Sequence, residues 1–225
     1  MQRRQWIVVV GAGTLGSWMA CPAWALSESQ AGDGVREALS RGAESAVSLL
    51  GRQDGFLGNP QVRIPLPKGL ESAASMLKML GQQRRVDELV TAMNRAAESA
   101  VPEARPLLVN AVKAMSIQDA VNIVRGGDTS VTDFFAGKTR APLTDKFLPI
   151  VTAQTQKVSL AAKYDAVASK GAALGLIDSE DANVEHYVTR KAIDGLFFMI
   201  GQEEKKIRSD PVGTGSALLK AVFGH

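Results

Sequence analysis

The sequence predicts an all-α protein built as one multi-helix domain, and three observations support this. Aromatic residues make up only 5% of the 225 residues while alanine, leucine and valine dominate, a composition that favours helices over sheets. Apolar residues recur at a spacing close to 3.6 through most of the chain. Residues that cap or break helices, such as Asn183 and Pro211, stand at the ends of these periodic stretches.

An export signal is predicted at the N-terminus. Two arginines near the start precede an apolar stretch, residues 6–20, that is too short and too rich in glycine for a stable membrane span. Ala23 and Ala25 complete an A-x-A cleavage site. We therefore expect a signal peptide over residues 1–25 and a periplasmic or secreted mature chain, exported by the Sec route or, given the paired arginines, by the twin-arginine route.

The leader also contains a G-x-G-x-x-G pattern at residues 11–16, the spacing of a dinucleotide-binding loop. Its context argues against that function, because Pro22 interrupts the following helix and no strand ending in an acidic residue follows. Cys21 is the only cysteine, so cleavage after Ala25 leaves a mature chain without cysteine. Disulfides, cysteine nucleophiles and thiolate metal sites are then excluded.

The rest of the chain is expected to form a short flexible start, residues 26–33, and a single helical domain over residues 34–225. The formal net charge is +3, but the leader arginines supply much of it, and no long basic block follows. We therefore expect no nucleic-acid partner. A chain of this size buries roughly 70% of its unfolded surface, so it needs no metal to fold.

The elements are predicted in order from periodicity and breakers. Asp33 is expected to cap a helix over residues 34–52. Residues 54–67 hold three prolines and two glycines, so we expect an ordered extended segment lying across the helices, with a short β-hairpin as one form of it. Ser116 and Asp119 resemble a capping box. The remaining helices are predicted over residues 69–80, 83–100, 102–115, 117–125, 129–135, 142–156, 157–173, 184–208 and 214–223.

One polar cluster falls within a single turn of the predicted 83–100 helix. Arg95 and Glu98 are three residues apart, Asn94 adjoins them, and flanking alanines would let another helix approach. The cluster is either a structural ion pair at a helix crossing or the polar lining of a pocket, and the sequence leaves both interpretations open.

Two further places carry polar groups in unusual settings. Arg125 and Asp128 flank two glycines, which either cap the neighbouring helices or present backbone N–H groups to an anion. Asp194 stands in an apolar run, where a half-buried carboxylate needs a partner. The candidate binding residues are therefore Asn94, Arg95, Glu98, Arg125, Asp128 and Asp194.

Histidine chemistry has little support. After the leader, the chain has only His186 and the terminal His225, with no spacing that would hold zinc and no G-x-S-x-G elbow. We expect neither a metal nor a cofactor.

Several segments together resemble the bacterial domain-of-unknown-function family 4197. The likeness runs from about residue 32 to Gly224, with Gly201 where alanine is expected. The resemblance implies an exported bacterial protein and one fold unit, and it implies no activity. The segments are GFLGNP at 55–60, IPLP at 64–67, MNRAAE at 93–98, RGGD at 125–128, KFLPIV at 146–151, YVT at 187–189, DGLF at 194–197 and EEKKIR at 203–208.

These observations favour a periplasmic ligand-binding or protein-interaction domain without catalysis, whose partner is an envelope protein or a small ligand. The alternative is an enzyme with an unknown substrate that combines carboxylates and arginines. A third hypothesis, docking of an amphipathic helix on a membrane surface, is weakened by the near-neutral charge. The residues of the enzyme hypothesis are Glu98, Asp128, Asp194 or Glu204 with Arg95 or Arg125.

Overall fold

A computed structural model describes residues 28–157, 161–162, 165 and 183–210 of the chain. Within these ranges the ordered elements are all helices, which confirms the predicted all-α class. The predicted signal peptide, the predicted 214–223 helix and most of the predicted 157–173 helix lie outside the described residues.

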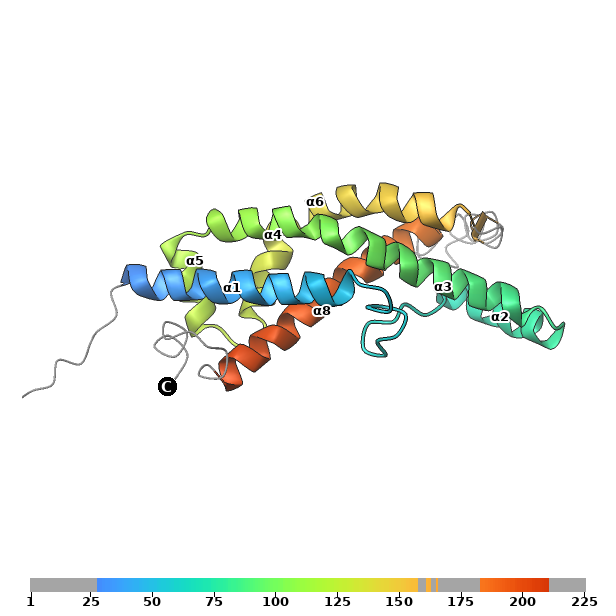
Figure 1. Cartoon of the computed structure of the whole chain (residues 1–225), viewed down its shortest axis with the longest axis horizontal. Coiled ribbons are helices and arrows are strands. Elements are labelled where there is room, and N and C mark those ends of the chain that lie inside the picture. Colours follow the sequence, from blue (N-terminus) through green and yellow to red (C-terminus); the bar gives the residue numbers. More distant parts are fainter. Residues whose placement is uncertain (1–27, 158–160, 163–164, 166–182, 211–225) are drawn as a thin grey trace, which may run out of the picture.

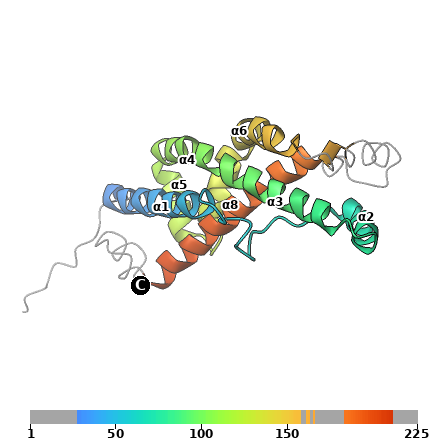
Figure 2. The same ribbon diagram turned by 45° about the vertical axis from the view of Figure 1, so that its right-hand side comes forward.

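Helix α8 runs diagonally through the fold and packs against α6, α1 and α3 (Figures 1 and 2). The hydrophobic core lies along these contacts. Phe135, Leu143 and Phe147 of α6 and Leu196 of α8 are fully buried there. The elements are α1 Glu28–Leu50, α2 Lys68–Met79, α3 Gln83–Ala100, the 3-10 helix η1 Val101–Glu103, α4 Ala104–Lys113, α5 Ile117–Arg125, α6 Ser130–Thr155 and α8 Val184–Ser209.

Helix α1 begins at Glu28, which is six residues earlier than predicted. Asp33 is therefore not a cap, and residues 28–33 are helical rather than loose. The Asp33 carboxylate instead pairs with the Arg36 guanidinium at 2.9 Å, one turn further along the same helix. Arg36 also donates to the Met115 carbonyl at 3.0 Å, and this ties the start of α1 to the α4–α5 connection.

Helix α6 is continuous, whereas two helices over 129–135 and 142–156 were predicted. Pro142 and Pro149 lie inside it, and each removes the donor for the carbonyl four residues earlier. Those carbonyls belong to Lys138 and Asp145, whose exposed positions let water replace the lost donor. Tertiary packing along the helix outweighs the cost of the two prolines.

The buried residues of α6 recur at every fourth position, so the buried face turns by about 40° at each step. This rotation lets one helix contact α3, α4 and α8 along its length. Because of this rotation, the apolar residues do not stay on one face, and a 3.6-residue periodicity in the sequence does not identify one continuous helix. The buried positions are Val131, Phe135, Thr139, Leu143, Phe147, Val151 and Thr155.

Two of the predicted caps, at Ser116 and Asn183, are confirmed, whereas Thr129 precedes α6 without a side-chain cap bond. The Asp119 N–H donates to the Ser116 hydroxyl at 3.1 Å, and the Ser116 N–H donates to the Asp119 carboxylate at 3.0 Å. The hydrogen bonds from Ser116 lower the pKa of Asp119. The side chain of Asn183 accepts a hydrogen bond from the His186 N–H at 3.0 Å and caps α8. These helix starts are set by residues within one turn.

Among the described helices, none by itself has the length and apolar character needed to cross a membrane. One bent pair, Gln83–Lys113 followed by Ile117–Arg125 at 103°, reaches that length and composition when taken together.

Candidate functional site

Residues 51–67, which we call the crossing segment, connect α1 to α2 and lie across α3 and α8. The segment contains successive turns, including bonds from the Gly55 N–H to the Arg52 carbonyl at 3.0 Å and from the Arg63 N–H to the Asn59 carbonyl at 2.9 Å. The segment is ordered and crosses the helices as predicted, but the β-hairpin form is wrong. Its N–H groups bond within turns and to side chains of α3, so no strand partner is needed.

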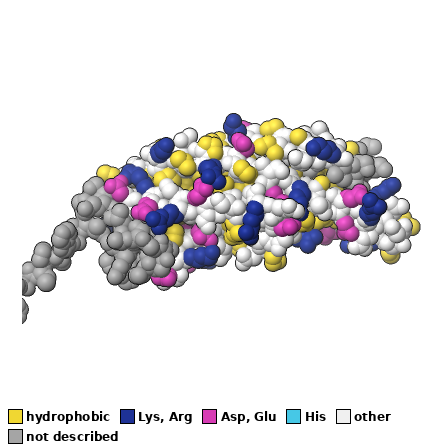
Figure 3. Space-filling model, in the orientation of Figure 1, with side chains coloured by type: hydrophobic (Ala, Val, Ile, Leu, Met, Phe, Trp, Pro, Cys, Tyr) yellow, Lys and Arg dark blue, Asp and Glu magenta, His cyan; other side chains and the backbone are white. Residues whose placement is uncertain are grey.

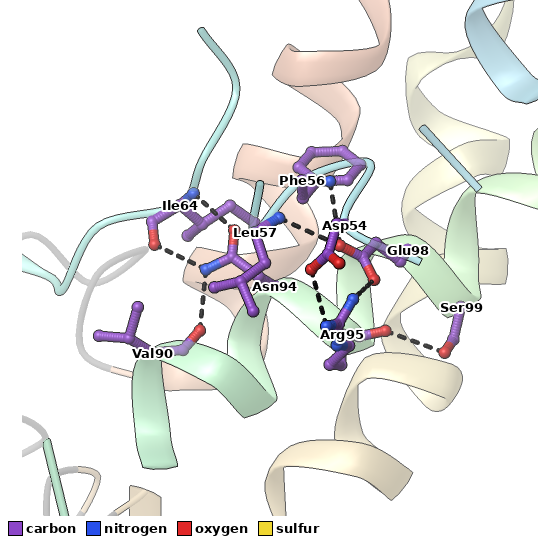
Figure 4. A network of polar contacts seen from close by, with 9 residues as sticks. All are labelled: Asp54, Phe56, Leu57, Ile64, Val90, Asn94, Arg95, Glu98 and Ser99. Atoms are coloured by element: carbon purple, nitrogen blue, oxygen red, sulfur yellow. Dashed lines mark hydrogen bonds and ion pairs between the residues drawn. The ribbon is translucent and has the colours of Figure 1, made fainter. Parts of the chain in front are cut away.

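Asn94 holds the second half of the crossing segment (Figure 4). Its side-chain oxygen accepts from the Ile64 N–H at 2.9 Å, and its amide nitrogen donates to the Ile64 carbonyl at 3.0 Å. The same nitrogen donates to the Val90 carbonyl at 2.8 Å. Asn94 is fully buried. Its side-chain amide therefore satisfies both backbone groups of Ile64, as a neighbouring strand would, at a position that water cannot reach.

Glu98 holds the first half of the crossing segment (Figure 4). One carboxylate oxygen accepts from the N–H groups of Phe56 and Leu57, both at 3.0 Å. The other oxygen pairs with Arg95 at 2.6 Å, and Arg95 also reaches Asp54 at 2.8 Å. The hydrogen bond to Glu98 raises the pKa of Arg95, which stays charged. Asn94, Arg95 and Glu98 therefore form one network that fixes the crossing segment.

Helix α8 closes the other side of the crossing segment. Phe56 is fully buried against Gly195, where a Cβ atom would come within 2.8 Å of the Phe56 ring and 3.4 Å of Val62 Cβ. The Tyr187 hydroxyl donates to the Pro65 carbonyl at 3.2 Å. The glycine in the apolar run of α8 is therefore a place where the crossing segment packs closely against the helix.

The other three candidate binding residues do not join this network. Asp194 pairs with Arg140 of α6 at 2.9 Å, so the partner that it was expected to need is present. Arg125 ends α5, and Asp128 lies in the α5–α6 connection; both are exposed. Figure 1 shows α5 beside the start of α1, whereas the crossing segment follows the opposite end of α1.

Glu204 is the centre of a second buried network. Its carboxylate accepts from both Arg208 at 3.0 Å and the Val131 N–H at 3.3 Å. Arg208 also donates to the Ile123 carbonyl at 2.9 Å and to the Ser130 hydroxyl at 2.8 Å. This network ties the end of α8 to the α5–α6 connection, so Glu204 joins helices in the way Glu98 joins the crossing segment to α3.

The enzyme hypothesis required its carboxylates and arginines to meet in one concave pocket, and in the described chain they do not. Glu98 and Glu204 are each 4% exposed and engaged in separate networks, while Asp194 is paired on a third surface. Within the described ranges, no three His, Cys, Asp or Glu side chains are grouped to hold a metal ion. Glu98 and Glu204 therefore each hold separate parts of the fold together.

Residues 25–224 match the family described as "Protein of unknown function (DUF4197)". The chain belongs to this family. No curated protein and no solved structure matches it. The match covers nearly the whole length, which agrees with the resemblance drawn from the separate segments.

Most of the segments that carry the family resemblance lie at the two networks. Those at 55–60 and 64–67 lie within the crossing segment, and those at 93–98 and 187–197 contact it. The segment at 203–208 supplies Glu204 and Arg208 to the second network. In this DUF4197 chain, these five recognisable stretches therefore help to hold the helices and the crossing segment in place.

The described part of the chain has an apolar groove between α1 and α5, and no pattern in the sequence pointed to it. Its volume is about 170 Å³, which is similar to engineered apolar cavities of about 150 Å³ that take benzene. Ile117 is 52% exposed at one side, and Arg125 supplies a positive charge. The lining residues are Gly32, Val35, Ile117, Ala120, Val121, Val124 and Arg125.

Replacing Asp165 by asparagine should raise the melting temperature modestly at neutral pH. Burial, with the nearby Glu185 carboxyl group adding to it, raises the pKa of Asp165. Ionisation of Asp165 therefore costs folding free energy, and this cost appears as the pH rises through the raised pKa. Asparagine keeps an oxygen for the Val184 N–H, which donates to Asp165 at 2.9 Å, and carries no charge.

The measurement is thermal unfolding followed by circular dichroism between acid and neutral pH. The advantage of Asp165→Asn should shrink as the pH falls towards about 3.9, the ordinary aspartate pKa, where the wild-type carboxyl is also neutral. Asp87→Asn, on an exposed position of α3, is the control and should change little. A loss of stability for Asp165→Asn that is equal at every pH would contradict the prediction.

Proposed function

We propose that this protein is a non-catalytic interaction domain of the bacterial envelope, which binds an apolar, acidic-flanked segment of a partner protein in the α1–α5 groove. The observation that carries the proposal is the groove itself. It is lined mainly by aliphatic side chains of two helices and is open among the described residues, whereas the carboxylates of Glu98 and Glu204 are engaged in the two networks.

The chemistry of the groove defines the kind of partner. Ile117, Val121 and Val124 offer aliphatic surface of a size that suits one large apolar side chain. Arg125 is exposed beside them, so a carboxylate next to the apolar side chain would gain a charge-assisted hydrogen bond. A short amphipathic segment with one buried anchor fits this description.

A photo-crosslinking amino acid in place of Val121 tests this proposal in living cells. We expect an adduct with a second protein after irradiation, and we expect the charge reversal Arg125→Glu to reduce it strongly. The same crosslinker in place of Val109, an exposed apolar residue of α4, is the matched control and should give no such adduct.

Two outcomes overturn the proposal. One is an adduct from position 121 that does not depend on Arg125 or forms equally from position 109. The other is a crosslink within the chain to residues 211–225, which follow α8 and carry Leu218, Leu219 and Phe223. A chain truncated after Asp210 identifies that second case, because the internal crosslink would disappear.

The envelope location is part of the proposal and is supported by the leader pattern alone. N-terminal sequencing of the protein from a periplasmic extract should find Leu26 as the first residue. Recovery of the uncleaved chain from the cytoplasm alone would remove this part of the proposal.

A further inference from the structure

The hairpin of α2 and α3 extends from the body of the fold as an arm. Among the described elements, α3 provides the main packing surface for α2. Figures 1 and 2 both show α2 and the first half of α3 reaching beyond the other helices. The two helices bury Ala74, Val86 and Leu89, so the arm has its own apolar seam and a free tip.

The tip of the arm presents the two most exposed large apolar side chains of the described residues. Met79 is 80% exposed and Leu80 is 70% exposed, and both stand at the end of α2. Gly81 turns the chain with φ of 73°, and no atom lies within 4 Å of where its Cβ would be. No described residue therefore packs over the tip at Gly81, and a projecting turn of this kind suits insertion into a soft surface better than into a preformed pocket.

Positive charge surrounds these apolar side chains. Lys78, Arg84 and Arg85 are exposed, and no acidic residue occurs between residues 78 and 85. Arg84 contacts Glu88 at 3.2 Å, but the two side chains are 91% and 55% exposed, so water screens this pair. Figure 3 shows basic side chains beside apolar ones at this end of the molecule.

The acidic residues of the arm lie further from the tip. Glu71 is in the first turn of α2, and Asp87 and Glu88 are in the second turn of α3. Cations next to exposed apolar groups, with acids set back, match the interface of an anionic bilayer, where headgroups bind the cations and acyl chains take the apolar groups.

We propose that the tip of the α2–α3 arm docks the protein on a membrane surface containing anionic phospholipid. Met79 and Leu80 enter the interfacial layer, and Lys78, Arg84 and Arg85 contact the phosphates. The interaction is peripheral and reversible, since only two apolar side chains insert. The α1–α5 groove lies towards the other end of the molecule, so this docking is independent of the partner proposed above.

Tryptophan fluorescence offers a direct test, because all three tryptophans of the chain, Trp6, Trp18 and Trp24, fall in the predicted leader. Leu80→Trp in the chain from Leu26 onwards then carries a single tryptophan, which can be excited selectively at wavelengths above the tyrosine absorption. We expect a blue shift on mixing with vesicles in which phosphatidylglycerol makes up about a third of the lipid. Phosphatidylcholine vesicles should give little shift, and Val109→Trp is the matched control that should give none.

Vesicle flotation of the chain without tryptophan gives the second readout. Met79→Ser with Leu80→Ser should weaken association about tenfold, and Arg84→Gln with Arg85→Gln should do so by a similar factor at low salt. Val109→Ser with Phe198→Ser removes two exposed apolar side chains elsewhere, and should leave binding unchanged. Circular dichroism confirms that each variant is folded.

Three results overturn this proposal. The first is no association of the wild-type chain with anionic vesicles at low salt. The second is equal association of the tip variant and the Val109 and Phe198 control. The third is a blue shift of the residue-80 tryptophan that requires an added envelope protein, which would make the tip a protein-binding surface.

Discussion

Replacing Glu98 by alanine should lower the free energy of unfolding by about 3 kcal/mol. The substitution removes the acceptor for the N–H groups of Phe56 and Leu57, and it leaves Arg95 with only Asp54. The Phe56 N–H is buried, so water cannot replace the lost acceptor. Most of the loss in unfolding free energy therefore comes from leaving this N–H group buried without a hydrogen bond.

Urea unfolding measures this loss, and hydrogen exchange locates it. The amides of Phe56 and Leu57 should exchange faster in Glu98→Ala than in the wild type, because the crossing segment loses its attachment. Glu98→Gln keeps one oxygen for these amides and should cost less. Glu88→Ala removes an exposed glutamate of the same helix and should cost less than about 1 kcal/mol. If Glu98→Ala behaved like Glu88→Ala, the network would not hold the segment.

Gly195→Val should destabilise the protein by about 2–3 kcal/mol, through overpacking. A Cβ at this position meets the Phe56 ring at 2.8 Å, and the ring is fully buried, so it has no space to move aside. Replacing a glycine inside a helix by alanine usually increases stability, whereas this substitution should decrease it.

Gly137→Ala is the matched control, since Gly137 is an exposed glycine of α6 with no atom near its Cβ position. It should stabilise the protein by about 0.5–1 kcal/mol, because alanine restricts the unfolded chain. Combining Gly195→Val with Phe56→Ala should cost less than the sum of the two single changes. If the changes in unfolding free energy were simply additive, the two side chains would not be in steric conflict.

Much of the fold was predictable because helix starts and stops depend on neighbours in sequence. The capping box of Ser116 and Asp119 and the cap at Asn183 were identified from residue type and spacing, and the structure contains both. The Arg95–Glu98 pair was equally predictable, since residues three apart in a helix face each other. The continuity of α6 was not predictable, because its buried face rotates along the helix and its prolines suggested a break.

The sequence by itself determined the helical class, most helix boundaries, the family and the choice of polar residues worth following, since these depend on local spacing and residue type. Only the tertiary structure decided what those polar residues do. Glu98 meets backbone groups about 40 residues away, and Asp194 meets an arginine 54 residues away. Only the tertiary structure shows the groove and the arm as well, because both are surfaces that form when the helices pack. The physical reason is that contacts between distant residues depend on how helices cross, and no local pattern records that geometry.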